Sequence, residues 1–146
     1  MENIQQLQVV FTIEADNFRM LHWKSAGRGF DRAHKISGDY YDMIGADIDG
    51  IAEIMLRDGI NPLTLAECVA AVDDVDGVRV SPDTDYNVDA VINYADEILK
   101  VIVKSIGKIL EDYQDTESIG IKSYFEGLYD KYDKEWRYLN ARRMRE

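Results

Sequence analysis

The stretch LHWKSAGRGFDRAH, residues 21–34, separates two long helical patterns and contains both histidines of the chain. Before it, apolar residues recur every three or four positions, which predicts an amphipathic helix over about residues 3–24. Two glycines then interrupt the pattern. After them, apolar side chains at helical spacing predict a second helix from Phe30 to a stop at Asp58-Gly59. The stretch is therefore the turn of a helical hairpin.

The second half of the chain repeats this arrangement without repeating the sequence. Apolar residues at helical spacing predict a third helix over about residues 88–110 and a fourth over about residues 121–139. The fourth ends in a basic run at residues 141–145, which suits a helix C-terminus. Both hairpins have short connections, so each pair of helices is expected to pack side by side.

A long crossover joins the two hairpins. Thr64 with Glu67 three residues later fits a capping box and predicts a short helix over residues 64–72. Residues 73–86 are typical of a loop. Four helices with one long crossover indicate an all-α, ferritin-like four-helix bundle whose crossover carries a short helix. At this length we expect a single domain over residues 1–146.

The composition is that of a globular protein with an acidic surface. The 146 residues carry a formal net charge of −11, with 46% hydrophobic and 31% charged residues. This charge disfavours non-specific nucleic-acid binding by the folded body and attracts cations, although an acidic balance can also serve solubility alone. No apolar run approaches the roughly 20 residues that span a bilayer, and no export signal is evident, so a cytoplasmic location is expected. Cys68 is the single cysteine, which argues against a disulfide framework or a thiolate metal cluster.

His22 and His34 are the candidate imidazole ligands. Residue 28, midway between them, lies in the glycine break, so a hairpin that turns there places the two histidines opposite each other. They can then share one metal ion or at least one pocket. A purely structural role for the histidines, as hydrogen-bonding residues, stays open.

Asp49 and Glu53 are the candidate carboxylate ligands, because at i and i+4 they share one face of the second helix. Like charges at this spacing cost a few tenths of a kcal/mol unless a cation neutralises them, and a solvated face is the alternative. His34 and Asp49 lie roughly 22 Å apart along a helix that rises about 1.5 Å per residue. They cannot bind one metal ion within a single chain.

A second copy of the chain could bring a histidine of one subunit next to the carboxylates of the other. If the second helix packs antiparallel against its own copy, with the crossing between residues 41 and 42, His34 of one chain faces Asp49 of the other. Glu53 then lies within side-chain reach. The sequence thus predicts an isologous dimer with metal sites between its subunits. The same crossing pairs small residues, which permit close approach: Ser37 with Ala46, and Gly38 with Gly45.

Taken together, these residues resemble the Dps family of mini-ferritins, the DNA-binding proteins from starved cells. The resemblance extends over the whole chain. It implies a bundle that assembles from two-fold dimers into a hollow dodecameric shell, with ferroxidase centres at the two-fold interfaces. It also implies oxidation of Fe(II), preferably by hydrogen peroxide, and storage of ferric iron, which protects against oxidative damage. The matching features are His22-Trp23, Gly27, Phe30, His34, Asp49 and Glu53 within IDGIAE, a Pro-Leu-Thr-Leu segment and the ending KEWRYLNAR.

The resemblance also assigns ligands. His22 and His34 would come from one subunit, and Asp49 and Glu53 from its two-fold partner. Imidazole with carboxylate suits Fe(II) and Fe(III), and zinc or another divalent metal fits the same set. Trp23, beside His22, is either a packing residue or a nearby electron donor.

Two departures from the family pattern concern the second iron position and DNA. Gly38 stands where many members have a further aspartate, and Asp39 and Asp42 point elsewhere on an ideal helix. The N-terminus lacks the lysine-rich tail with which DNA-coating members commonly bind, so weak or no DNA binding is expected. Arginines near the C-terminus could contact phosphates or could simply end a helix: Arg142, Arg143 and Arg145.

Two other functions fit parts of the pattern. One is a non-enzymatic helical oligomer of the same fold that binds a divalent metal but oxidises iron weakly or not at all. The other is an all-α nucleotide hydrolase that uses Mg²⁺, which requires a second acidic cluster on a facing helix. The nearest such cluster is Asp112 with Asp115 and Glu117, which also fits helix capping.

Overall fold

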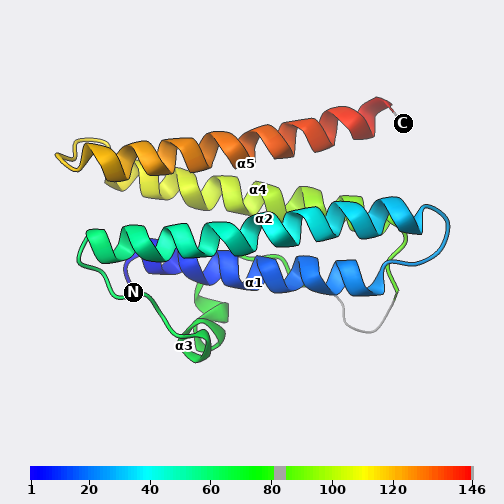
Figure 1. Ribbon diagram of the computed structural model, residues 1–146, viewed down its shortest axis with the longest axis horizontal. Helices are drawn as coiled ribbons and strands as arrows, with labels where there is room; N and C mark the ends of the chain where they lie inside the picture. Colours follow the sequence, from blue (N-terminus) through cyan, green and yellow to red (C-terminus); the bar gives the residue numbers. More distant parts are fainter. Residues whose placement is uncertain (81–84, 146) are drawn as a thin grey trace.

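The computed structural model describes residues 1–80 and 85–145, with side chains described as far as residue 141. Within these residues, four long helices run along the molecule and a short helix lies beside them (Figure 1). The all-α prediction and the order of the helices are confirmed. The elements are α1 (Asn3–Lys24), α2 (Phe30–Arg57), α3 (Leu65–Ala70), the 3-10 turn η1 (Val72–Asp74), α4 (Val88–Asp112) and α5 (Ile119–Arg145).

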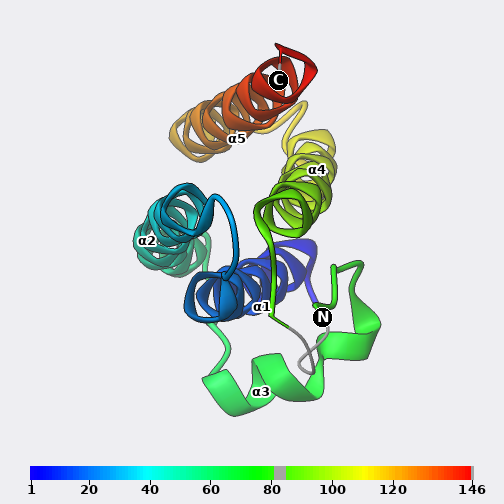
Figure 2. The ribbon, with the colours of Figure 1, turned by 90° about the vertical axis from the view of Figure 1, so that its right-hand side faces the viewer.

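The helices form two hairpins, α1 with α2 and α4 with α5. Viewed along the bundle, α1 and α5 occupy opposite corners, and α3 lies outside the bundle next to α1 (Figure 2). The part of the crossover that carries α3 and η1 therefore runs over the outer surface of α1. The capping box at the start of α3 is confirmed, because Thr64 Oγ1 accepts from the Glu67 amide at 3.2 Å and Glu67 Oε1 accepts from the Thr64 amide at 3.0 Å. None of the described helices is long and apolar enough to cross a membrane.

The turn between α1 and α2 requires its glycines. Gly27 and Gly29 have φ angles of 83° and 81°, a left-handed conformation that other residues adopt only with strain. The far end of the crossover is hydrogen-bonded to this turn. The Ala26 amide donates to the Tyr86 carbonyl and the Tyr86 amide to the Lys24 carbonyl, both at 2.8 Å. The turn between the two histidines is thus fixed by the conformation of its glycines and by hydrogen bonds to the end of the crossover.

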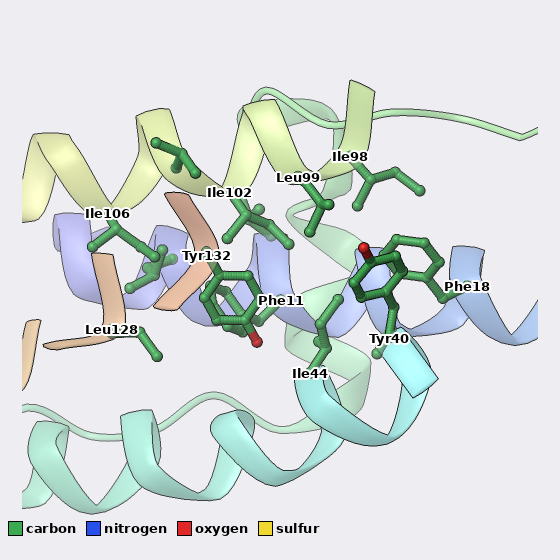
Figure 3. Close-up of a cluster of buried hydrophobic side chains, with 14 of the residues drawn as sticks. Phe11, Phe18, Tyr40, Ile44, Ile98, Leu99, Ile102, Ile106, Leu128 and Tyr132 are labelled. Atoms are coloured by element: carbon green, nitrogen blue, oxygen red, sulfur yellow. The ribbon is translucent and has the colours of Figure 1, made fainter. Parts of the chain in front are cut away.

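The core is a continuous set of buried aliphatic and aromatic side chains drawn from all four long helices (Figure 3). Phe11 and Tyr132 meet edge to face at its centre, with ring centroids 5.3 Å apart. Phe18 and Tyr40 form a second aromatic pair, with centroids 5.2 Å apart. Burial of these side chains supplies most of the favourable free energy of folding. Figure 3 also labels the aliphatic members that surround them: Ile44, Ile98, Leu99, Ile102, Ile106 and Leu128.

Glu14 attaches the crossover to α1. Its side chain is fully buried. Its Oε1 accepts from the Val78 amide at 3.0 Å, and Asn17 Nδ2 donates to its Oε2 at 3.4 Å and to the Val78 carbonyl at 2.6 Å. Burial raises the pKa of the Glu14 carboxyl from 4.5 to about 7, against the lowering effect of these hydrogen bonds.

The Glu14 shift predicts a specific pH dependence. A folded-state pKa above the unfolded value means that folding takes up a proton, so stability falls as the pH rises from about 4.5 through about 7. The penalty above this range is on the order of 3 kcal/mol. We expect Glu14→Gln to remove this pH dependence, and Glu111→Gln, at an exposed site on α4, to retain it. Denaturant unfolding at a series of pH values checks this; equal pH dependence in wild type and Glu14→Gln would contradict it.

Candidate metal centre

The hairpin brings His22 and His34 into direct contact. Their rings stack with centroids 3.8 Å apart and an angle of 19° between planes. Each ring is hydrogen-bonded to the backbone of the other residue: His22 Nδ1 lies 2.8 Å from the His34 carbonyl oxygen, and His34 Nδ1 lies 2.9 Å from the His22 carbonyl oxygen. The two histidines thus form a reciprocal pair at the end of α1 and the start of α2.

The carbonyl partners determine where each ring carries its proton. A carbonyl oxygen only accepts, so each Nδ1 donates, and in the neutral ring Nε2 carries the lone pair. Ligating histidines in metalloproteins commonly donate their second ring nitrogen to a backbone carbonyl, which orients the ring and fixes the tautomer. The pair therefore has the protonation pattern of two Nε2 ligands, and this fits a divalent metal such as Fe(II) or zinc.

Gly38 provides the space for the His22 ring. A Cβ atom at position 38 would lie 2.9 Å from both Cε1 and Nδ1 of His22, closer than side-chain atoms pack. On the other side of the pair, the Phe30 ring stacks on His34 with centroids 5.3 Å apart. We did not predict either contact from the sequence, although Phe30 and His34 at i and i+4 on one helix face could have suggested the second.

Trp23 does not pack into the core. Its side chain is 62% exposed, and the Arg19 guanidinium lies 4.7 Å from the ring centre. Arg19 also pairs with Asp16. This arrangement rules out burial in the bundle as the reason for Trp23 at this position; its role as an electron donor stays a prediction.

Asp49 and Glu53 lie on the exposed face of α2, as the i and i+4 spacing predicts. The structure does not bring them to the histidines of the same chain. Across residues 1–80 and 85–145, no three His, Cys, Asp or Glu side chains of one chain gather at a position that could hold a metal ion. Each chain therefore presents two separate sets of candidate ligands.

The sequence analysis did not identify two residues close to Asp49 and Glu53, which are Asp47 and Tyr124. Asp47, which is half-buried, accepts from Tyr132 OH at 2.6 Å and from Lys131 Nζ at 2.9 Å, and so ties α2 to α5. Burial, with the nearby charges of Asp47 and Glu53, raises the pKa of Tyr124 to about 12. The phenol of Tyr124 lies so close to Gly50 that a Cβ atom on residue 50 would overlap it. No periodicity in the sequence indicates which α5 side chains reach α2.

The predicted pairing of small residues between two copies of α2 is wrong for Ser37. Ser37 is fully buried within its own chain, where its hydroxyl donates to the Ala33 carbonyl at 2.7 Å, so it cannot face Ala46 of a second copy. Gly38 has an internal reason to be small, which is the His22 ring. Gly45 and Ala46 are exposed, and no side chain or distant backbone of the described residues lies within 4 Å of a Cβ atom at Gly45. This part of α2 is open.

A groove borders the open part of α2. It has a volume of about 850 Å³ and lies between α1, α2 and the crossover. Two apolar side chains of α3 at its edge, Leu65 and Val69, are 70% and 64% exposed. Exposed apolar side chains beside a groove are typical of a surface that another molecule covers.

The acidic cluster proposed for a nucleotide hydrolase lies at the turn between α4 and α5. Asp112 Oδ2 accepts from Asn3 Nδ2 at 2.7 Å, and Asp115 and Glu117 are exposed. Among the described residues, these side chains do not belong to a group of three His, Cys, Asp or Glu that could hold a metal ion. Three arginines considered for DNA contact lie outside the described side chains: Arg142, Arg143 and Arg145.

Comparison with known proteins defines the fold. No protein-family model and no curated protein matches the chain by sequence. Among solved structures, it is similar to the CAIP protein of Helicobacter cinaedi, with a TM-score of 0.86 and 18% identity over 97% of this chain and 96% of that one. It is similar to the Dps protein of Vibrio cholerae O1, described as a member of a broad superfamily of ferritin-like diiron-carboxylate proteins, with a TM-score of 0.82 and 19% identity over 95% and 85%.

Dps of Staphylococcus aureus is a third such structure, with a TM-score of 0.80 and 19% identity over 95% of this chain and 91% of that one. The resemblance that the sequence motifs indicate is thereby confirmed for the fold. The chain has the ferritin-like fold of Dps proteins, a four-helix bundle with a short helix in the crossover.

Proposed function

We propose that this chain is the subunit of a Dps-type mini-ferritin, which oxidises Fe(II) at sites between subunits and stores the ferric product. The observation that carries the proposal is the reciprocal histidine pair, with each Nδ1 on a carbonyl and both Nε2 atoms left for a metal. The fold of Dps proteins supports it, since the solved neighbours include one described as a ferritin-like diiron-carboxylate protein.

A two-fold dimer would complete the site. Asp49 and Glu53 are exposed on the open part of α2, where Gly45 leaves room for a second helix. Packing against a copy would bring these carboxylates to the partner's histidines and would neutralise a like-charge pair. The groove beside this part of α2 supports self-association. We propose that such dimers assemble further into a closed shell.

The proposed reaction balances as 2Fe²⁺ + H₂O₂ + 2H⁺ → 2Fe³⁺ + 2H₂O. Peroxide accepts two electrons, so two ferrous ions supply them without release of a hydroxyl radical. The chain would bind the ferrous substrate through imidazole and carboxylate and would leave coordination positions open for peroxide. Exposed Trp23, adjacent in sequence to His22, would supply an electron where a second ferrous ion is absent.

Peroxide-driven iron oxidation tests the proposal. We expect wild-type protein with Fe(II), mixed with peroxide under exclusion of oxygen, to give a ferric absorbance rise well above the rate in buffer. Asp49→Asn with Glu53→Gln should lose most of this rate, on the order of 100-fold, because the carboxylate half of the site is removed. The matched control is Glu126→Gln with Asp130→Asn, an exposed carboxylate pair at the same spacing on α5.

A wild-type rate equal to that in buffer would contradict the ferroxidase proposal. If the protein then still bound zinc through the same four residues, the non-enzymatic metal-binding oligomer would be the better description. An anomalous-scattering map of crystals soaked with Fe(II) without oxygen would show the metal directly. Absence of density between His34 and the Asp49 of a second subunit would reject the site itself.

A further inference from the structure

We propose that Tyr86, at the end of the crossover, is a positioning residue of the histidine half-site. Its backbone takes the Ala26 amide away from α1, and this leaves the His22 carbonyl to accept from the His34 ring. The inference rests on the proposed function, because it says what holds two of the proposed metal ligands in place. Figure 1 shows the end of the crossover beside the turn between α1 and α2.

The last turn of α1 gives up one of its own hydrogen bonds. In a continuing α-helix each carbonyl accepts from the amide four residues later, so the His22 carbonyl would accept from the Ala26 amide. The helix instead ends at Lys24, and Ser25 has an extended backbone with a φ of −66° and a ψ of 134°. The Ala26 amide donates to the Tyr86 carbonyl at 2.8 Å. The His22 carbonyl therefore lacks its helical donor.

Two side chains replace that donor. The His34 Nδ1 atom lies 2.9 Å from the His22 carbonyl oxygen, and the Ser25 hydroxyl donates to the same oxygen at 3.1 Å. A carbonyl oxygen has two lone pairs, so these two hydrogen bonds satisfy it. An Ala26 amide that returned to α1 would compete with both for this oxygen. The hydrogen bond that orients the His34 ring therefore depends on the crossover holding Ala26.

Tyr86 is itself firmly attached to the bundle. Its amide donates to the Lys24 carbonyl at 2.8 Å, so its two main-chain groups bind the turn on either side of Ser25. Its side chain is buried and packs edge to face on Tyr94 of α4, with ring centroids 5.7 Å apart. The next residue, Asn87, is the N-cap of α4, and its side chain accepts from an amide of the first turn at 2.9 Å. The turn between the histidines is thus attached to the start of α4.

The histidine tautomers of metal-free protein test this role, by solid-state NMR with ¹⁵N-labelled histidine. At alkaline pH we expect the neutral His34 ring of wild type to carry its proton on Nδ1. In Tyr86→Ala we expect the Nε2-protonated form, which predominates in free histidine, to appear. Tyr86→Phe keeps the ring and the main-chain groups, so it should behave as wild type. A His34 ring protonated on Nε2 in wild type, or still fully on Nδ1 in Tyr86→Ala, would overturn the inference.

Phe125→Ala is the matched control for a general loss of stability. The Phe125 side chain is also buried, but it stacks with Tyr113 at the turn between α4 and α5, with ring centroids 5.9 Å apart. This turn lies at the opposite end of the bundle from the turn that carries the histidines (Figure 1). The tautomer of His34 should therefore stay as in wild type. An equal change in Phe125→Ala and Tyr86→Ala would show a general loosening of the bundle and would overturn the positioning role.

Hydrogen exchange in the wild-type protein tests the same coupling without any variant. If the attachment of Tyr86 raises the affinity of the site for a metal ion, metal binding must strengthen that attachment by the same factor. Groups that orient metal ligands change affinity roughly 10- to 100-fold, so we expect saturating zinc to slow exchange of the Ala26 and Tyr86 amides at least about tenfold. The Thr116 amide, which donates to the Tyr113 carbonyl at 3.3 Å, is the control and should not change. Equal exchange of the Ala26 and Tyr86 amides with and without zinc would overturn the inference.

Iron oxidation enters neither measurement, so the inference and the proposed function can fail separately. The expected tautomers and zinc-dependent protection, in a protein that oxidises iron no faster than buffer, would support the inference and reject the ferroxidase. Iron oxidation by Tyr86→Ala at the wild-type rate, with His34 still protonated on Nδ1, would retain the ferroxidase and overturn the inference.

Discussion

Equal amounts of His34→Ala and Asp49→Ala subunits, unfolded together and reassembled, are expected to recover about a quarter of the wild-type rate of iron oxidation. Each variant alone should lose the activity on the order of 100-fold, because every site then lacks one ligand. In a mixed dimer, one site takes both histidines from the Asp49→Ala chain and both carboxylates from the His34→Ala chain. Random pairing makes half of the dimers mixed, and one of the two sites in each mixed dimer is intact. A quarter of all sites are therefore intact.

The matching negative control mixes His22→Ala with His34→Ala. Both changes damage the histidine half, so every site in a mixed dimer still lacks one imidazole and no activity should return. Stopped-flow measurement of ferric absorbance compares the two mixtures. Equal recovery in both, or none in the first while wild type reassembles with full activity, would contradict a site shared between subunits.

The fold was predictable because apolar periodicity is a local property of the chain. Steps of three and four predict α1 and α2 almost to their observed ends, and the capping box at Thr64 and Glu67 locates α3. The turn was equally predictable, since two glycines in a short break indicate a left-handed backbone conformation. Gly27 and Gly29 adopt this conformation. From the hairpin alone it followed that the two histidines lie opposite each other, and their rings are in contact.

The parts that sequence reasoning missed depend on atoms from distant segments. A helical projection places Ser37 beside Gly38 but does not show which side of the bundle each faces, and the predicted contact of Ser37 with a partner was wrong. The ring over Gly38 comes from α1, and the phenol on Asp47 comes from α5. The same holds for Glu14, whose pKa is raised by burial and whose carboxylate accepts a hydrogen bond from a crossover amide 64 positions away.

Phe11→Ala is expected to lower the free energy of unfolding by about 3–5 kcal/mol, the second large effect that the structure predicts. The Phe11 side chain is completely buried and packs edge to face on Tyr132, so its removal leaves a cavity and ends an aromatic contact. Tyr138→Ala is the matched control, because that aromatic side chain on α5 is 53% exposed; we expect a change within about 0.5 kcal/mol. Denaturant unfolding at fixed subunit concentration measures both.

The position of Phe11 connects this loss of stability to the candidate site. Tyr132, against which Phe11 packs, donates its hydroxyl to Asp47 on α2, two residues before Asp49. A cavity at Phe11 lets Tyr132 move and so loosens the link between α5 and the carboxylate face of α2. Phe11→Ala should therefore weaken zinc binding at temperatures where the bundle is still folded, while Tyr138→Ala should not. A loss of stability of less than about 1 kcal/mol would show that the aromatic pair is not the centre of the core.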